Sequence, residues 1–234
     1  MNKNKPVRKS DSIRISEESF EENLPIESWR IFKIMAEFVL GFELLRRYGL
    51  AATIFGTARC QFGDKIYQNA QKLAGMLSRE GFTIITGGAS GVMEAANRGA
   101  HEAGGNSVGL NIDLPDEQSF NQYTTDSEKF HYFFTRKVML AFASEVYVFF
   151  PGGFGTLDEF FEIVTLVQTK KIKPVPIVLV SREYWQPLLT WIEKGLYEKH
   201  QVIAKEDMQI YRVTDTVDEA FEIIMNLTKK KEKK

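Results

Sequence analysis

The sequence is short of cysteine and histidine, and both shortages narrow the possible chemistry. Cys60 is the only cysteine among 234 residues, so the chain cannot form an intramolecular disulfide or a zinc site built from several thiolates. The three histidines, His101, His131 and His200, are scattered and show no metal-ligand spacing. We therefore expect no metal site, and the single cysteine fits a cytoplasmic protein.

A strong net charge and a long apolar run are also missing. The formal net charge of −1 at pH 7 gives no basic field of the kind that draws a protein to nucleic acid. No stretch reaches the roughly 20 apolar residues of a membrane span, and the first residues, MNKNKPVRKSDS, lack the apolar segment of a secretory signal. We expect a soluble protein with no nucleic-acid or membrane partner, in which any anion site is local.

The sequence does contain enough apolar residues, 44%, to build one α/β domain with appendages. We expect residues 1–20 to form a flexible arm, 21–49 a helical extension, 50–228 the main domain and 229–234 a basic tail. The helix predicted over 29–48 has apolar residues too far around its circumference for one-sided packing. A partner subunit and the protein's own domain are equally good candidates for covering it.

From residue 50 onward, short apolar runs alternate with stretches of helical periodicity. The predicted strands are 51–57, 82–86, 106–112, 146–150, 175–180 and 208–213, and the predicted helices include 64–79, 92–103, 135–143, 156–169 and 185–198. Because the strand runs are continuously apolar, both faces of the sheet should be covered. The alternation predicts an α/β fold, a Rossmann-like doubly wound parallel sheet with helices on both faces.

Three loops that follow predicted strands are rich in small residues. They are GTAR at 56–59, GGASG at 87–91 and PGGFGT at 151–156. Ligands bind such sheets beyond the carboxyl ends of the strands, and glycine there lets backbone N–H groups approach an anion at a helix N-terminus. One such loop is as well explained by a tight turn, whereas three at the same edge favour a phosphate or nucleotide site. Neither the dinucleotide-binding spacing nor a P-loop is present, so a mononucleotide or sugar phosphate is the expected ligand.

Two carboxylates follow the third loop directly. Asp158 and Glu159 lie at the predicted start of a helix, where they could simply interact with the helix dipole. Alternatively, Glu159 faces the space left by the glycines, where it can stabilise a developing cation or activate water. Thr165, two turns further on, lines the pocket or bonds to its own backbone.

A second charged pair begins an otherwise apolar helix. Arg136 and Lys137 follow FHYFFT at 130–135, and they either reach out to solvent or meet an anionic partner. We favour contact with the phosphate or the carboxylates of the site.

Three segments resemble the "lonely guy" phosphoribohydrolases, which activate cytokinins and were long mislabelled as lysine decarboxylases. They are TGGASGVMEAANRGA (86–100), TRK (135–137) and PGGFGTLDE (151–159), which are similar to the TGGGxGxMEAANRGA, RK and PGGxGTxxE patterns of that family in order and spacing. The similarity covers roughly residues 50–225. Two departures, Ala89 for the third glycine and Ser90 for a common proline, bear on substrate choice.

The resemblance implies that 50–228 is a Rossmann-like nucleotide-binding catalytic domain in a homodimer or higher homo-oligomer. It implies that Arg136 and Glu159 are catalytic and that a nucleoside 5′-monophosphate is the substrate. The implied substrate-binding residues are Gly87, Gly88, Gly91, Glu117, Lys137, Gly152, Gly153, Gly155, Thr156 and Thr165. Glu117 is placed by its position in LPDEQSFN.

These observations lead to the hypothesis that the protein hydrolyses the N-glycosidic bond of AMP or of a cytokinin riboside 5′-monophosphate. Glu159 would stabilise the cation that develops on the ribose and orient or deprotonate water, while Arg136 holds Glu159 and the nucleotide in register. No cofactor is expected. A non-catalytic nucleotide-binding or carrier protein would use the same loops, whereas a lysine decarboxylase would need a pyridoxal phosphate lysine that no lysine here marks.

Overall fold

The computed structural model of the chain describes residues 28–113 and 121–231. The predicted arm at 1–20, the predicted ligand residue Glu117 and the last residues of the predicted tail, 232–234, lie outside these ranges.

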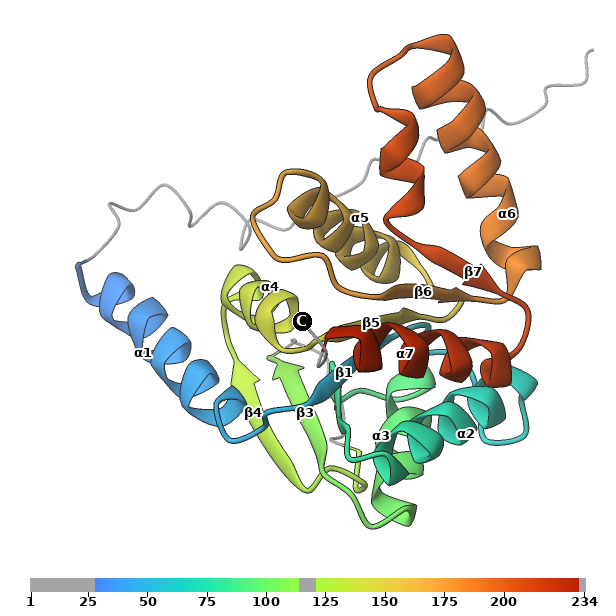
Figure 1. Ribbon diagram of the computed structural model, residues 1–234. Coiled ribbons are helices and arrows are strands. Elements are labelled where there is room, and N and C mark those ends of the chain that lie inside the picture. The colour runs from blue at the N-terminus through green and yellow to red at the C-terminus, as the bar shows by residue number, and fades with distance from the viewer. Residues whose placement is uncertain (1–27, 114–120, 232–234) are drawn as a thin grey trace, which may run out of the picture.

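A seven-stranded sheet organises the molecule (Figure 1). Its strands are β1 (Ala51–Phe55), β2 (Thr83–Thr86), β3 (Ser107–Ile112), β4 (Asp126–Phe130), β5 (Val146–Phe149), β6 (Ile177–Val180) and β7 (Arg212–Thr214). They lie in the order β4-β3-β2-β1-β5-β6-β7, and every neighbouring pair is parallel. The chain therefore winds outward from β1 in both directions, and the order of the strands reverses between β1 and β5.

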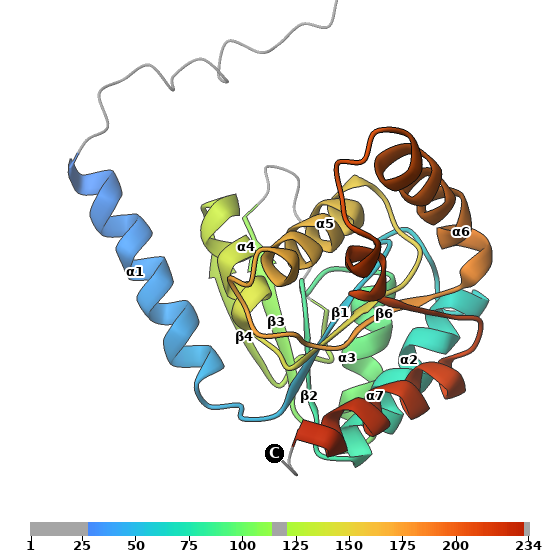
Figure 2. The ribbon, with the colours of Figure 1, turned by 45° about the horizontal axis from the view of Figure 1, so that its top comes forward.

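Helices cover both faces of the sheet, as Figures 1 and 2 show. One layer holds α2 (Lys65–Arg79), α3 (Val92–Glu102) and α7 (Val217–Lys231); the other holds α4 (Phe133–Phe142), α5 (Phe154–Gln168) and α6 (Arg182–Trp191), which continues as a π-helix at Ile192–Lys199. A core lies on each side: Ile54, Ile84 and Val148 face the first layer, and Leu110 and Phe149 face the second. The predicted doubly wound fold is confirmed.

Two predictions at the edges of the sheet were inaccurate. Residues 205–209 form a 3-10 helix, so only Arg212 and Val213 of the strand predicted over 208–213 belong to β7. The sequence prediction missed β4, whose residues, DSEKF, alternate between partly buried and exposed until Phe130. An edge strand with one open face has no continuous apolar run, and the expectation of buried strands overlooked it. Helix α7 extends to Lys231, past the predicted domain end at 228.

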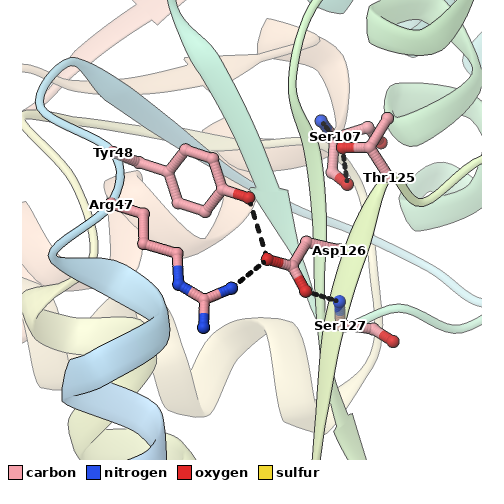
Figure 3. A network of polar contacts seen from close by, with 6 residues as sticks. All are labelled: Arg47, Tyr48, Ser107, Thr125, Asp126 and Ser127. Atoms are coloured by element: carbon pink, nitrogen blue, oxygen red, sulfur yellow. Dashed lines mark hydrogen bonds and ion pairs between the residues drawn. The ribbon is translucent and has the colours of Figure 1, made fainter.

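Polar contacts attach the amino-terminal extension to the edge of the sheet. Its helix α1 (Ser28–Leu45) lies beside α4 and β4 (Figure 2). Immediately after α1, Arg47 Nη1 and Tyr48 Oη donate hydrogen bonds to Asp126 Oδ2 at 2.9 and 3.1 Å (Figure 3). In the same view, Thr125 Oγ1 donates to the carbonyl oxygen of Ser107 at 3.0 Å and so ties β4 to β3. The extension is therefore docked on the domain along one side.

The other side of α1 is apolar and exposed. Seven large apolar side chains of α1 are about half exposed or more: Trp29, Ile31, Phe32, Met35, Val39, Leu40 and Phe42. We call this set the α1 apolar face. Within residues 28–113 and 121–231, the domain leaves this face uncovered. None of the described helices is long and apolar enough to cross a membrane.

Candidate active site

A cavity of about 880 Å³ opens where the strand order reverses. Its lining comes mainly from the loops after β1 and β5, residues 56–59 and 151–157, with Met93 and Tyr184 added from α3 and α6. The backbone N–H of Thr57 donates to the carbonyl of Pro151 at 3.0 Å, so the two loops are bonded to one another. The volume and the position at the switch point of a parallel sheet are typical of a small-molecule site.

The loop after β5 keeps its shape because Gly152 has no side chain. A Cβ on Gly152 would collide with the Thr156 side chain and come within 3.1 Å of the Gly56 carbonyl carbon. Gly153 is the N-cap of α5, and the first residues of that helix, Phe154 and Gly155, line the cavity. Since the first N–H groups of a helix have no acceptor within it, this end of α5 is suited to an anion. Gly152, Gly153, Gly155 and Thr156 thus lie where the sequence predicted a phosphate loop.

The loop after β2 packs against the loop after β1. Gly91, the N-cap of α3, has a φ of 70°, and a side chain there would also collide with the carbonyl of Thr57. Gly88, with a φ of 70° as well, is packed against the Asn111 side chain. Ala89, one of the two departures from the family pattern, is buried and does not line the cavity.

A buried polar network holds this second loop in place. The amide of Asn97, on α3, accepts hydrogen bonds from Thr86 Oγ1 at 2.6 Å and from Asn121 Nδ2 at 3.0 Å. Thr86 Oγ1 in turn accepts a bond from the Gly88 N–H at 2.9 Å. Buried amides of this kind stabilise one loop conformation because an unpaired group would be costly. The MEAANRG segment therefore positions the loop through Asn97.

Arg136 reaches the same edge of the sheet from α4. Its Nε donates to the Leu110 carbonyl at 2.7 Å and its Nη2 to the Gly87 carbonyl at 3.2 Å. A Cβ on Gly87 would collide with both this guanidinium and the thioether of Met93, which lines the cavity. Burial lowers the pKa of Arg136, and the nearby carboxyl of Glu159 opposes that change.

Glu159 faces α4 from α5. It is only 5% exposed, and its Oε2 has no hydrogen-bond partner among the described residues. The pKa of Glu159 is raised to about 8: burial is the largest cause, the negative charge of Glu162 adds to it, and Lys137 and Arg136 oppose the shift. Because α5 begins at Phe154, Asp158 and Glu159 lie beyond its first turn, and the capping role that the sequence allowed for them loses its basis.

Lys137 forms ion pairs with two carboxylates of α5. Its Nζ lies 2.7 Å from Asp158 Oδ2 and 3.3 Å from Glu162 Oε2, and its side chain is 21% exposed. Of the two partners that the sequence suggested, phosphate or carboxylate, the described structure shows the second. Arg136, Lys137 and Glu159 are therefore brought together on the facing helices α4 and α5.

The predicted residues are not equally close to the cavity. Arg136 and Glu159 do not form part of its lining, and they make no direct ion pair with each other within the described ranges. Thr165 is exposed on α5 and also lies outside the lining. Its carbonyl accepts a bond from Thr169 Oγ1 at 2.7 Å.

Sequence reasoning missed several residues that line the cavity. Tyr184 Oη donates to the carbonyl of Gly152 at 2.5 Å and so braces the loop after β5 from α6. Arg59 is the only charged side chain in the described lining, although the sequence singled out only its loop. Tyr184 follows β6, and a search of every loop after a strand, including those without glycine, would have included it.

Comparisons with known proteins identify relatives of this chain. The family model described as "Possible lysine decarboxylase" matches residues 93–224, more than half of the chain. The cytokinin riboside 5′-monophosphate phosphoribohydrolase of Rhodococcoides fascians is 28% identical over 154 residues, 63% of this chain and 76% of that protein. A probable enzyme of the same name from rice is 32% identical over 133 residues, 55% of this chain and 53% of its own length.

Among solved structures, the molybdenum cofactor carrier protein of Chlamydomonas reinhardtii aligns with a TM-score of 0.58 at 22% identity, over 76% of this chain and 98% of that one. This likeness shows the fold alone. The family model, in contrast, spans Met93, Arg136, the phosphate loop and Glu159. The chain therefore belongs to the family of that model, the lonely guy family to which its curated relatives belong.

Proposed function

We propose that this protein is a hydrolase that cleaves the N-glycosidic bond of a nucleoside 5′-monophosphate and releases the free base and ribose 5-phosphate. One observation carries the proposal: the guanidinium of Arg136 and the buried carboxyl of Glu159 lie on the facing helices α4 and α5, close to a cavity lined by the loops after β1 and β5. The names of the curated relatives point to the same reaction and to cytokinin nucleotides as candidate substrates beside AMP.

The glycine loops suit the 5′-phosphate. The N-terminal end of α5 supplies N–H groups at Phe154 and Gly155, and Arg59 adds a guanidinium on the other side of the cavity. Binding the phosphate provides energy remote from the bond that breaks, which holds C1′ of the ribose in place. Monophosphates should accordingly be better substrates than nucleosides.

Glu159 suits the glycosidic step. As the bond between C1′ and the base nitrogen breaks, the bonding pair leaves with the base and positive charge develops on the sugar. The Glu159 carboxylate stabilises this charge and accepts a proton from the attacking water, whose oxygen bonds to C1′; the base nitrogen takes up a proton from solvent as the base departs, and Glu159 returns its proton to solvent. Arg136, held by two backbone carbonyls, keeps Glu159 and the nucleotide in register. Met93, which lines the cavity, lies beside Gly87 as the Arg136 guanidinium does, and its flexible side chain can move to admit the substrate toward Arg136.

A base-release assay tests the proposal. The purified protein is incubated with nucleoside 5′-monophosphates, including AMP and isopentenyladenosine 5′-monophosphate, and with the matching nucleosides, and free base is measured by chromatography. We expect release from at least one monophosphate, with kcat/KM lower by roughly tenfold or more for its nucleoside. If no free base is released from any monophosphate, the proposed hydrolase activity is refuted.

Non-catalytic nucleotide binding is the second candidate. It is favoured by one observation, the absence of Arg136 and Glu159 from the lining of the cavity. A carrier of this kind would bind the monophosphate in a calorimeter and release no base on prolonged incubation, so the same panel separates the two candidates.

We also propose that the protein acts in the cytoplasm as a homodimer or higher homo-oligomer, with a second copy of the chain covering the α1 apolar face. Isolated exposed apolar residues are ordinary, but seven on one helix form a continuous surface of the kind that marks an interface. Phe133, Phe134 and Phe142 on the adjacent α4 are each at least half exposed and extend this surface. A self-complementary face of this composition fits a symmetric pair.

A further inference from the structure

Three carboxylates and one ammonium group lie between α4 and α5. Asp158, Glu159 and Glu162 come from about one turn of α5, and Lys137 comes from α4. Lys137 Nζ is 2.7 Å from Asp158 Oδ2 and 3.3 Å from Glu162 Oε2. The Lys137 ammonium therefore contacts two of the three acidic groups directly, and Arg136 on the same helix α4 is the only other cation that influences Glu159 among the described residues.

Two oxygen atoms of this cluster are buried without a hydrogen bond. They are Oε2 of Glu159 and Oε2 of Glu162, and the second is served only by the longer contact to Lys137. Buried polar atoms are almost always hydrogen-bonded, so a pair of unsatisfied carboxylate oxygens one helical turn apart needs a reason. A contribution to folding stability does not explain this pair, because two close carboxylates repel each other.

We propose that Glu162 is a positioning residue for Glu159: with Asp158 it fixes the Lys137 ammonium beside the Glu159 carboxyl, and its own negative charge sets the ionisation of that carboxyl. This inference rests on the proposed function, because it takes Glu159 as the reacting group. Glu162 itself need not touch the substrate.

The other charged groups around Glu159 have identifiable effects. After burial, Glu162 is the largest influence that raises the pKa of Glu159; Lys137 and Arg136 lower it, and Asp158 raises it least. From the sheet, Tyr147 of β5 also faces this region, but burial raises the pKa of its phenol and its hydroxyl donates to the Ala141 carbonyl, so it adds no charge. The ionisation of Glu159 is thus governed by two like charges, of which Glu162 is the stronger influence, and two opposite ones.

Charge-neutral variants test the inference by the direction in which they move the titration of Glu159. Glu162→Gln keeps the size of the side chain and removes its charge, so the midpoint should move down by roughly one pH unit. Lys137→Gln should move it up. Asp158→Asn should move it down by less than Glu162→Gln, although Asp158 makes the shorter contact with Lys137. Glu162→Asp keeps the charge and should restore a midpoint near that of the wild type.

Two measurements report the midpoint of the Glu159 titration. The first is the pH at which the 13C signal of the Glu159 side-chain carboxyl changes, assigned by its loss in Glu159→Gln; the second is the pH dependence of kcat/KM for base release. As a matched control, Glu198→Gln breaks an ion pair of 2.7 Å with Lys194 on a different helix and should leave both midpoints unchanged.

Opposite shifts for Glu162→Gln and Lys137→Gln support the proposal. Midpoints that stay at the wild-type value in Glu162→Gln, or that move up, overturn it, even if the variant is less active. Should Glu162→Gln fail to fold by circular dichroism, the upward shift of Lys137→Gln and the unchanged midpoint of Glu162→Asp decide the question. The carbon signal needs no activity, so a protein that releases no base would refute the proposed function while this inference is still tested.

Discussion

The hydroxyl of Thr135 donates a hydrogen bond to the carboxylate of Glu37, and this contact joins the amino-terminal extension to the helix that carries Arg136. The same carboxylate accepts hydrogen bonds from the backbone N–H groups of His131 at 2.8 Å and Tyr132 at 3.2 Å. Glu37 on α1 therefore satisfies the N-terminal end of α4, where a negative charge is favourable. The family model begins at residue 93, so this support comes from outside the matched region.

Removing that carboxylate should weaken the fold around α4. We predict that Glu37→Ala lowers the free energy of unfolding by about 1–3 kcal/mol, because charge-assisted hydrogen bonds are lost and N–H groups are left unpaired. Denaturant unfolding measures the change. Glu43→Ala is the control: on the same helix it breaks only an exposed pair with Arg46, which contributes less than about 1 kcal/mol. Equal losses in the two variants would rule out the capping role of Glu37.

Activity should depend on the ionisation of Glu159. Its pKa is raised to about 8, and the carboxyl is protonated below that value, so a reaction that needs the carboxylate weakens as the pH falls. We predict that kcat/KM increases with pH up to an apparent pKa near 8 and falls about tenfold per pH unit well below it. A profile measured from about pH 6 to about pH 9.5 that declines with rising pH would mean that Glu159 acts as an acid instead.

The same shift has a consequence for folding. Between its ordinary value of 4.5 and about 8, the carboxyl of Glu159 holds a proton in the folded state that the unfolded state has lost. The folded state is therefore favoured at the lower end of this range, and the contribution of Glu159 to stability declines as the pH rises through it. Unfolding experiments at several pH values should show a steeper decline in the wild type than in Glu159→Gln, and parallel curves would contradict the raised pKa.

The phosphate loop should not tolerate a side chain at Gly152. A Cβ there collides with Thr156, so Gly152→Ala must displace the loop that lines the cavity. We predict that the KM for a nucleoside monophosphate rises roughly tenfold or more, because the N–H groups at the start of α5 no longer converge on the phosphate. Gly63→Ala adds a methyl where no atom lies within 4 Å and should behave as the wild type. Equal KM values for both variants would show that the loop does not bind phosphate.

The α1 apolar face should hold the oligomer together. Introducing a carboxylate with Phe32→Glu or Val39→Glu places a charge in the proposed interface, and the assembly should dissociate to monomers in light-scattering measurements. Lys33→Glu changes an exposed residue of the same helix that is already charged and should leave the assembly intact. A wild-type protein that is monomeric at high concentration would refute the proposal outright.

Much of the fold could be predicted because its signals are local. Strands β1, β2, β3, β5 and β6 are buried on both faces, so most of their residues are apolar and the runs were recognised to within two residues. Strand β4 lies at the edge, and its pairing with β3 depends on register with a strand elsewhere in the chain. Side chains such as Asp126, which is bonded to Arg47 and Tyr48, gain their role only after the chain has folded.

The candidate site could be predicted in part for the same reason. Glycines that directly follow strands indicate tight loops, which glycine's backbone freedom permits. Arg136 and Glu159 are recognisable because they are charged residues within apolar segments. No local pattern connects Lys137 with Glu162, since α4 and α5 meet only in three dimensions. Tyr184 likewise reaches Gly152 across 32 residues of sequence. Contacts of this kind arise from the topology of the sheet.

The central claim is that Glu159 enables hydrolysis at a site that binds the nucleotide through its phosphate. The most direct test compares wild type and Glu159→Gln on the best monophosphate of the panel, with base release measured at saturating substrate and binding measured by calorimetry. We predict that kcat falls by about 100-fold or more while the Kd changes by less than roughly threefold, since the carboxylate acts mainly in the transition state. Base release by Glu159→Gln at the wild-type rate would contradict the account.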